Sequence, residues 1–137
     1  MLKLLLIMAS VVATAQSVRT RIIRLDGVGD VKIGMTLDQL SATLHQKFPM
    51  PEQKEDQGCF YVSPRDYPSL MIENGRVVRV DVLQPGIPTA EGIQVGDTEA
   101  HVKENYGQRL EIKPSQYSGE EGGHYLTLRS KDGRYGV

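Results

Sequence analysis

The side chains suited to nucleophilic or metal chemistry are few and far apart in this sequence. There is one cysteine, Cys59, and the three histidines are His45, His101 and His124. A metal site needs several converging ligands, and the sequence has neither a cysteine pair nor a His-x-x-x-His spacing. A cysteine nucleophile needs a base beside it, and the residues around Cys59 are typical of a strand. We therefore predict no enzyme, no metal site and no cofactor, with the histidines in structural or solvated positions.

The lone cysteine allows two interpretations. Free cysteine is commonly a small buried apolar residue. Because Cys59 has no partner cysteine in the sequence, the alternative is a disulfide with another chain or with residues after position 137. The sequence leaves both interpretations open.

A glycine-rich loop holds the most suggestive residues for binding. The stretch PSQYSGEEGGHY, residues 114–125, combines tyrosines and glutamates just before a predicted strand. Tyrosine offers a large contact area and a hydroxyl group at low ordering cost, so recognition surfaces favour it. The alternative is a surface connection whose tyrosines pack on the sheet. We interpret the loop as a candidate surface for a protein partner, formed by Tyr117, Glu120, Glu121, His124 and Tyr125.

A second loop, SPRDYPS at residues 63–69, carries Arg65 and Tyr67 between two prolines that stiffen it. It is a further candidate for binding, with an ordinary connection as the alternative.

Two distant stretches share one pattern and predict the elements that position these residues. DVKIGMTLDQLSATLH begins at position 30 and GIQVGDTEAHVKENYG at position 92, and a shift of 62 places Gly96 on Gly34 and Thr98 on Thr36. Glycine permits a turn that other residues resist, and threonine is a favourable helix N-cap. Gln39 completes a capping box in the first copy. Each copy therefore predicts a turn followed by a helix. The helix stripes comprise Leu37, Leu40, Leu44 and Phe48, then Ala100, Val102 and Tyr106, with Gly107 as the second stop.

Antiparallel strands are predicted after each helix. Asn74-Gly75 between two apolar runs is a strong hairpin signal, and Asp132-Gly133 marks a second turn. In the strand after the first turn, Val78, Val80 and Val82 alternate with polar residues and are expected to share one buried face.

The chain divides into four parts on this pattern. Residues 1–15 are predicted to be a signal peptide, because Lys3 precedes the apolar run 4–12 and the small-x-small site 13–15. The first repeat covers 26–84, a linker 85–91, and the second repeat 92–137. The second repeat has only four residues after its turn, so we expect either a truncated chain or a final strand supplied by another chain.

Size and charge narrow the classes of function. The chain has 137 residues, of which 39% are hydrophobic, and a formal net charge of −1. A nucleic-acid-binding surface is usually basic, so we expect no nucleic acid partner. The apolar run 4–12 is too short to span a bilayer, so we expect a periplasmic or secreted protein without a transmembrane segment in the mature chain.

The paired IGMT and VGDT motifs, each followed by a helix and antiparallel strands, resemble the β-lactamase-inhibitor-protein-like fold, which includes the outer-membrane lipoproteins of the SmpA/OmlA family. The resemblance implies an α+β fold of two tandem helix-plus-antiparallel-sheet repeats, with helices packed on one face of a curved sheet. It suggests a non-catalytic protein-binding module, with enzyme inhibition as one form and a structural or assembly accessory of the bacterial envelope as the alternative. Two features depart from these relatives: no cysteine stands at the predicted cleavage site for a lipid anchor, and the single cysteine cannot form an internal disulfide.

Overall fold

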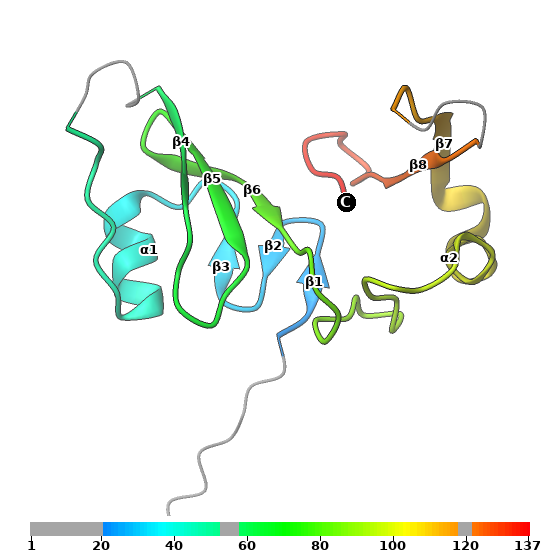
Figure 1. Cartoon of the computed structure of the whole chain (residues 1–137), viewed down its shortest axis with the longest axis horizontal. Coiled ribbons are helices and arrows are strands. Elements are labelled where there is room, and N and C mark those ends of the chain that lie inside the picture. Colours follow the sequence, from blue (N-terminus) through cyan, green and yellow to red (C-terminus); the bar gives the residue numbers. More distant parts are fainter. Residues whose placement is uncertain (1–20, 53–57, 118–121) are drawn as a thin grey trace, which may run out of the picture.

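The computed structural model describes residues 21–52, 58–117 and 122–137. Helices and antiparallel strands are both present, as predicted, and Figure 1 shows them in two groups, one around α1 and one around α2. The predicted signal peptide, residues 1–15, lies outside the described residues. The strands within these ranges form three small antiparallel sheets, ordered β1-β2-β3, β4-β5-β6 and β7-β8.

The first group contains a compact core. Helix α1 (Leu37–Leu44) shares a buried cluster with the sheet of β4 (Cys59–Val62), β5 (Ser69–Glu73) and β6 (Arg76–Asp81). The leucines of α1 recur at helical spacing, which places them on one side of the helix. Strand β5 alternates buried and less buried residues, as a half-buried strand should. The buried cluster consists of Val31, Leu37, Leu40, Phe48, Leu70, Ile72 and Val77.

Both ends of α1 follow from local sequence. The backbone N–H of Gln39 donates to the Thr36 hydroxyl at 3.3 Å, and the Thr36 N–H donates to Gln39 Oε1 at 3.0 Å, so the predicted capping box is confirmed. The helix ends at Leu44, and His45 adopts a left-handed conformation with φ 51°. Phe48, assigned to the helix stripe, lies beyond the helix but is buried in the same core.

The hairpin between β5 and β6 has the predicted turn. Asn74 and Gly75 have φ values of 50° and 73°, the positive pair that a type I′ turn requires. The predicted burial of Val78 is wrong, because the pairing shifts by one residue opposite Met71 and Ile72. Such a bulge interrupts the alternation of faces, so Val77 and Val80 both face the core although they are three residues apart. Val77 is therefore fully buried, whereas Val78 is 37% exposed.

The segment before α1 is fastened to β6. Strands β1 (Ile23–Arg24), β2 (Gly27–Val28) and β3 (Val31–Lys32) form a small sheet that leads into it. Gly34 N donates to Val77 O at 2.7 Å, and Val77 N donates to Met35 O at 2.9 Å. The segment after β3 therefore pairs with the start of β6, while β1-β2-β3 and β4-β5-β6 form separate sheets.

The second group has a thinner core. It comprises α2 (Glu99–Tyr106), a short 3-10 helix η2 (Gly107–Arg109), β7 (Leu110–Pro114) and β8 (His124–Leu128). His101 N donates to the Thr98 hydroxyl at 3.2 Å, and Gly107 ends α2 with φ 53°, as predicted. Among the described residues after the linker, only Ile93 and Tyr106 are buried hydrophobics.

Candidate protein-binding surface

The described residues of the predicted binding loop remain on the surface. Tyr117 is 82% exposed, and Tyr125 lies on β8, where it pairs with Lys113 of β7. The ring nitrogen Nδ1 of His124 lies 3.0 Å from Glu99 Oε1, so this histidine links β8 to the start of α2. Glu120 and Glu121 lie outside the described residues. Tyr117 and Tyr125 are therefore accessible to another protein, whereas the His124 ring already contacts Glu99.

Glu99 also bonds Lys103 one helical turn further along α2. The pKa of the Glu99 carboxyl is lowered, first by its bond to Lys103 and then by its bond to His124. Glu99 is therefore charged at neutral pH, at the positive end of α2.

The loop at residues 63–69 uses its tyrosine for packing. The Tyr67 hydroxyl donates to the carbonyl oxygen of Val28, and the guanidinium of Arg21 lies 5.0 Å from the centre of the Tyr67 ring. Burial raises the pKa of Tyr67 to about 12. Tyr67 therefore holds the loop against the β1-β2-β3 sheet, which favours the structural interpretation of this loop.

A cluster that sequence analysis did not identify lies on the β4-β5-β6 sheet. Tyr61, Met71 and Arg79 are direct neighbours across the three strands, so their side chains share one face. Tyr61 is 52% exposed. The side chains on the opposite face, such as Ile72, belong to the core that includes α1. The face with Tyr61 is therefore the one that α1 leaves uncovered.

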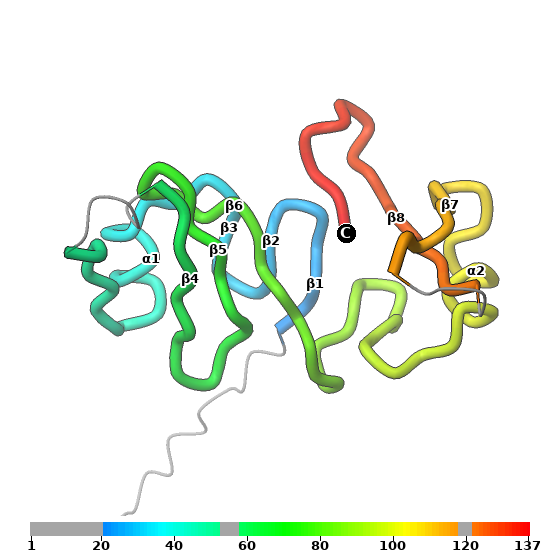
Figure 2. The backbone as a smooth tube through the Cα atoms, turned by 45° about the horizontal axis from the view of Figure 1, so that its top comes forward, coloured from blue at the N-terminus to red at the C-terminus, as the bar shows by residue number. Residues whose placement is uncertain are grey.

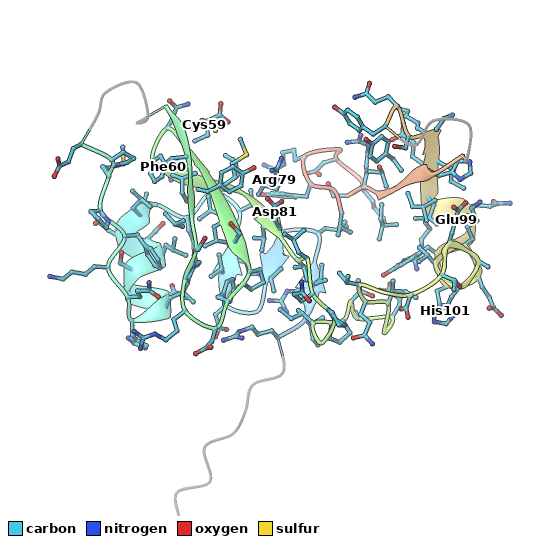
Figure 3. All side chains as sticks on the ribbon, in the orientation of Figure 1. Cys59, Phe60, Arg79, Asp81, Glu99 and His101 are labelled. Atoms are coloured by element: carbon cyan, nitrogen blue, oxygen red, sulfur yellow. The ribbon has the colours of Figure 1, made fainter. Side chains whose placement is uncertain are left out.

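Arg79 is held in place from two sides. It donates to Asp81 through Nε at 2.7 Å and through Nη2 at 3.1 Å, which is a two-pronged bond to one carboxylate. It also donates to the Tyr61 hydroxyl, and its guanidinium lies 5.7 Å from the centre of the Tyr61 ring. Figure 3 shows Arg79 and Asp81 on β6, at the opposite edge of the sheet from Cys59 on β4. The result is a bonded group in which the Tyr61 and Arg79 side chains are exposed and the half-buried Asp81 carboxylate holds the arginine.

Cys59 is exposed at the start of β4, which excludes the buried interpretation. Its strand assignment is confirmed, because β4 pairs with β5 from Cys59 to Val62.

A groove of about 560 Å³ lies beside this cluster. Its walls are the β1–β2 segment, β6 with the residues after it, Thr89 of the linker with residues 93–95, and the C-terminal residues 134–137. Most of its lining is apolar. Its three arginines each pair with a carboxylate of the chain: Arg24 with Asp26, Arg79 with Asp81 and Arg134 with Asp132. A groove of this volume is within the range of ligand-binding sites.

Within the described residues, no group of three or more histidine, cysteine, aspartate or glutamate side chains is placed to hold a metal ion, and no helix has the length and apolar character needed to cross a membrane. Comparison with known protein families, with curated proteins and with solved structures finds no match.

Proposed function

We propose that this chain is an exported, non-catalytic protein-binding module that binds its partner through the Tyr61, Arg79 and Asp81 cluster. The observation that carries the proposal is the ordered exposure of this cluster on the sheet face that α1 leaves uncovered. Tyrosine and arginine are the residue types that most often dominate the binding energy of protein interfaces. Met71 beside them adds an adaptable apolar contact.

The bonds within the cluster favour binding. A long arginine side chain loses rotamer entropy when a partner immobilises it. Because Asp81 and Tyr61 already hold Arg79 in one geometry, this loss is small on association. The cluster is therefore suited to a partner surface with a carboxylate or a backbone carbonyl opposite the guanidinium.

The fold supports an open binding face. We infer that the helices cover one side of a curved sheet in the bound protein and that the other side meets the partner. The support for this arrangement is the first group, where the face with Ile72 is buried and the face with Tyr61 is exposed.

The test compares variants in one binding measurement. The full chain and its Tyr61→Ala, Arg79→Ala and Arg79→Lys variants are immobilised and exposed to one bacterial envelope extract, and proteins whose capture depends on the variant are purified for titration. We expect Arg79→Ala to weaken binding by about tenfold or more, and Arg79→Lys to restore it only in part, since lysine cannot make the two-pronged bond.

Tyr117→Ala is the matched control, because Tyr117 is exposed but lies in the second group. We expect it to change the affinity less than Tyr61→Ala does. If Tyr61→Ala and Arg79→Ala bind as tightly as the unaltered chain, the cluster is not the binding surface. If Tyr117→Ala and Tyr125→Ala weaken binding instead, the surface is the loop that the sequence predicted.

A further inference from the structure

The outer edge of β6 has a backbone position that points toward the groove. Just after β5, Asn74 N donates to Gly58 O, and Gly58 directly precedes β4. Because the direction of the backbone bonds alternates along a strand, the even-numbered residues of β5 bond β4 and the odd-numbered ones bond β6. Arg79 and Asp81 of β6 are opposite odd-numbered residues of β5. Val80 lies between them, so its N–H and C=O point away from β5.

Val80 and Val77 differ in the hydrogen-bond partners of their outward backbone groups. The outward N–H and C=O of Val77 bond Met35 and Gly34. In the part of the chain that the structure describes, no such backbone bond is made by Val80. An unpaired strand edge of this kind is a template for another strand.

A second edge faces the same groove from the C-terminal segment. Val137 exchanges two backbone bonds with Leu128, at 2.6 and 2.9 Å, and Ser130 N donates to Tyr135 O at 2.9 Å. Gly136 lies between these bonded pairs, opposite Arg129, so its N–H and C=O point away from β8. Figures 1 and 2 both place this segment between β8 and the β1–β2 side of the first group.

The two edges and the apolar lining of the groove specify one kind of occupant. Val80 and Gly136 both line the groove, and so do the apolar side chains of Ile33 and Ile93. A strand laid between two strand edges bonds both of them, because its own N–H and C=O groups point alternately to either side. Because the three arginines of the lining already have carboxylate partners, the backbone edges and the apolar side chains determine the occupant.

We propose that the groove binds an extended strand of the partner protein, which bonds Val80 on one side and Gly136 on the other. Its apolar side chains lie on the floor of the groove. This inference rests on the proposed function and names the form of the partner. The added strand joins the first group to the β7-β8 hairpin through one continuous sheet.

The first experiment uses a synthetic peptide of about eight residues that alternates valine and glutamate, long enough to span both edges at 3.3 Å per residue. It is titrated into the isotope-labelled full chain, and amide signals are followed by NMR. We expect shifts at Val80 and Gly136, and amide exchange slowed by about tenfold or more at both. A peptide N-methylated on the edge-facing amides should not bind.

Variants of Gly136 isolate the backbone bond. Gly136→Pro removes the N–H that faces the groove, and proline is tolerated where the N–H of an edge strand has no partner. Gly136→Ala keeps the N–H and adds the same Cβ, which has no neighbour closer than 3.4 Å. We expect Gly136→Pro to abolish peptide binding and Gly136→Ala to preserve it. Equal binding by both variants would overturn the proposal.

The outcomes separate this inference from the proposed function. If the natural partner still requires Arg79 while Gly136→Pro binds it normally, strand addition is wrong and the binding surface stands. If Val80 and Gly136 show no change at millimolar peptide, strand addition of a partner is likewise overturned. If the two amides instead change as the chain dimerises in sedimentation experiments, the occupant is a second copy rather than a partner.

Discussion

Gly34 and Gly96 occupy equivalent positions at the starts of the two groups. Their φ values are 91° and 102°, and each lies two residues before a threonine that caps a helix. The helices α1 and α2 have the same length, eight residues. The local backbone of the motif is thus reproduced in both copies.

The surroundings of the two glycines differ. Gly34 is bonded to Val77 of β6, and Arg76 donates to the Gly34 carbonyl oxygen at 2.8 Å. In the described residues no corresponding backbone bond joins Gly96 to the segment after the Asp132-Gly133 turn, which pairs with β8 instead. The same motif therefore closes a core in the first group and leaves the second group open.

The helix side chains explain part of this difference. Leu37 and Leu40 of α1 fill the core, while the equivalent face of α2 has an exposed Ala100 and a half-buried Val102. Smaller side chains bury less apolar area and stabilise the packing less. A short motif can specify a turn and a cap, but the volume of the side chains decides whether a helix packs.

Truncating the helix core gives the largest expected effect. Leu40 is fully buried, so Leu40→Ala should lower the free energy of unfolding by about 2–5 kcal/mol. Val102 occupies the matching position in α2 and is half-buried, so Val102→Ala should cost about 1 kcal/mol or less. Urea unfolding followed by circular dichroism measures both. Equal costs would show that the second group has a core as complete as the first.

Features fixed by neighbouring residues were predictable. The capping box at Thr36, the hairpin at Asn74-Gly75 and the helix stop at Gly107 each depend on a few residues in sequence, and all three are confirmed. The bulge in β6 was not predictable, because it depends on how the whole strand fits against β5. That bulge moved Val78 to the surface and placed Arg79 opposite Met71.

The binding cluster was missed for the same reason. Tyr61 and Arg79 are 18 positions apart, and only the strand register brings them together. The alternation of polar and apolar residues in β4 and β6 shows that both positions can be exposed, but does not show that they are neighbours.

Alanine at the two motif glycines gives the second largest effect. A Cβ at either position meets no atom within 4 Å, so Gly34→Ala and Gly96→Ala cost stability only through the positive φ, by about 1–2 kcal/mol each. We expect Gly34→Ala to lower the free energy of global unfolding, because its turn is bonded to β6. Gly96→Ala should mainly speed amide exchange within α2.

Gly58→Ala is the matched control for these variants. Its Cβ also has open space, and its φ lies outside the positive region, so stability should change by less than about 0.5 kcal/mol. If Gly96→Ala lowered the free energy of global unfolding as much as Gly34→Ala does, the second group would be coupled to the core more tightly than its contacts indicate.

The smallest expected effect concerns acid stability. Lys32 Nζ donates to Asp26 Oδ2 at 2.7 Å, and this bond holds the pKa of Asp26 below its usual value of 3.8. A carboxyl group whose pKa is lowered by folding stabilises the fold above its unfolded pKa, and the contribution is lost as pH falls through the folded pKa. Both side chains are well exposed, so solvent screening limits the contribution to below about 1 kcal/mol.

Asp26→Asn should therefore flatten the decline in the free energy of unfolding below about pH 4 and leave its shape near neutral pH unchanged. Urea unfolding in a series of buffers measures this. Glu99→Gln is the counterpart in the second group, since the pKa of Glu99 is lowered by Lys103 and then by His124. Because Asp26 adjoins the strands that lead into the core and Glu99 lies on the thinly packed α2, only Asp26→Asn should alter global acid unfolding. A larger change in acid unfolding from Glu99→Gln than from Asp26→Asn would show that the second group contributes more to acid stability than the first.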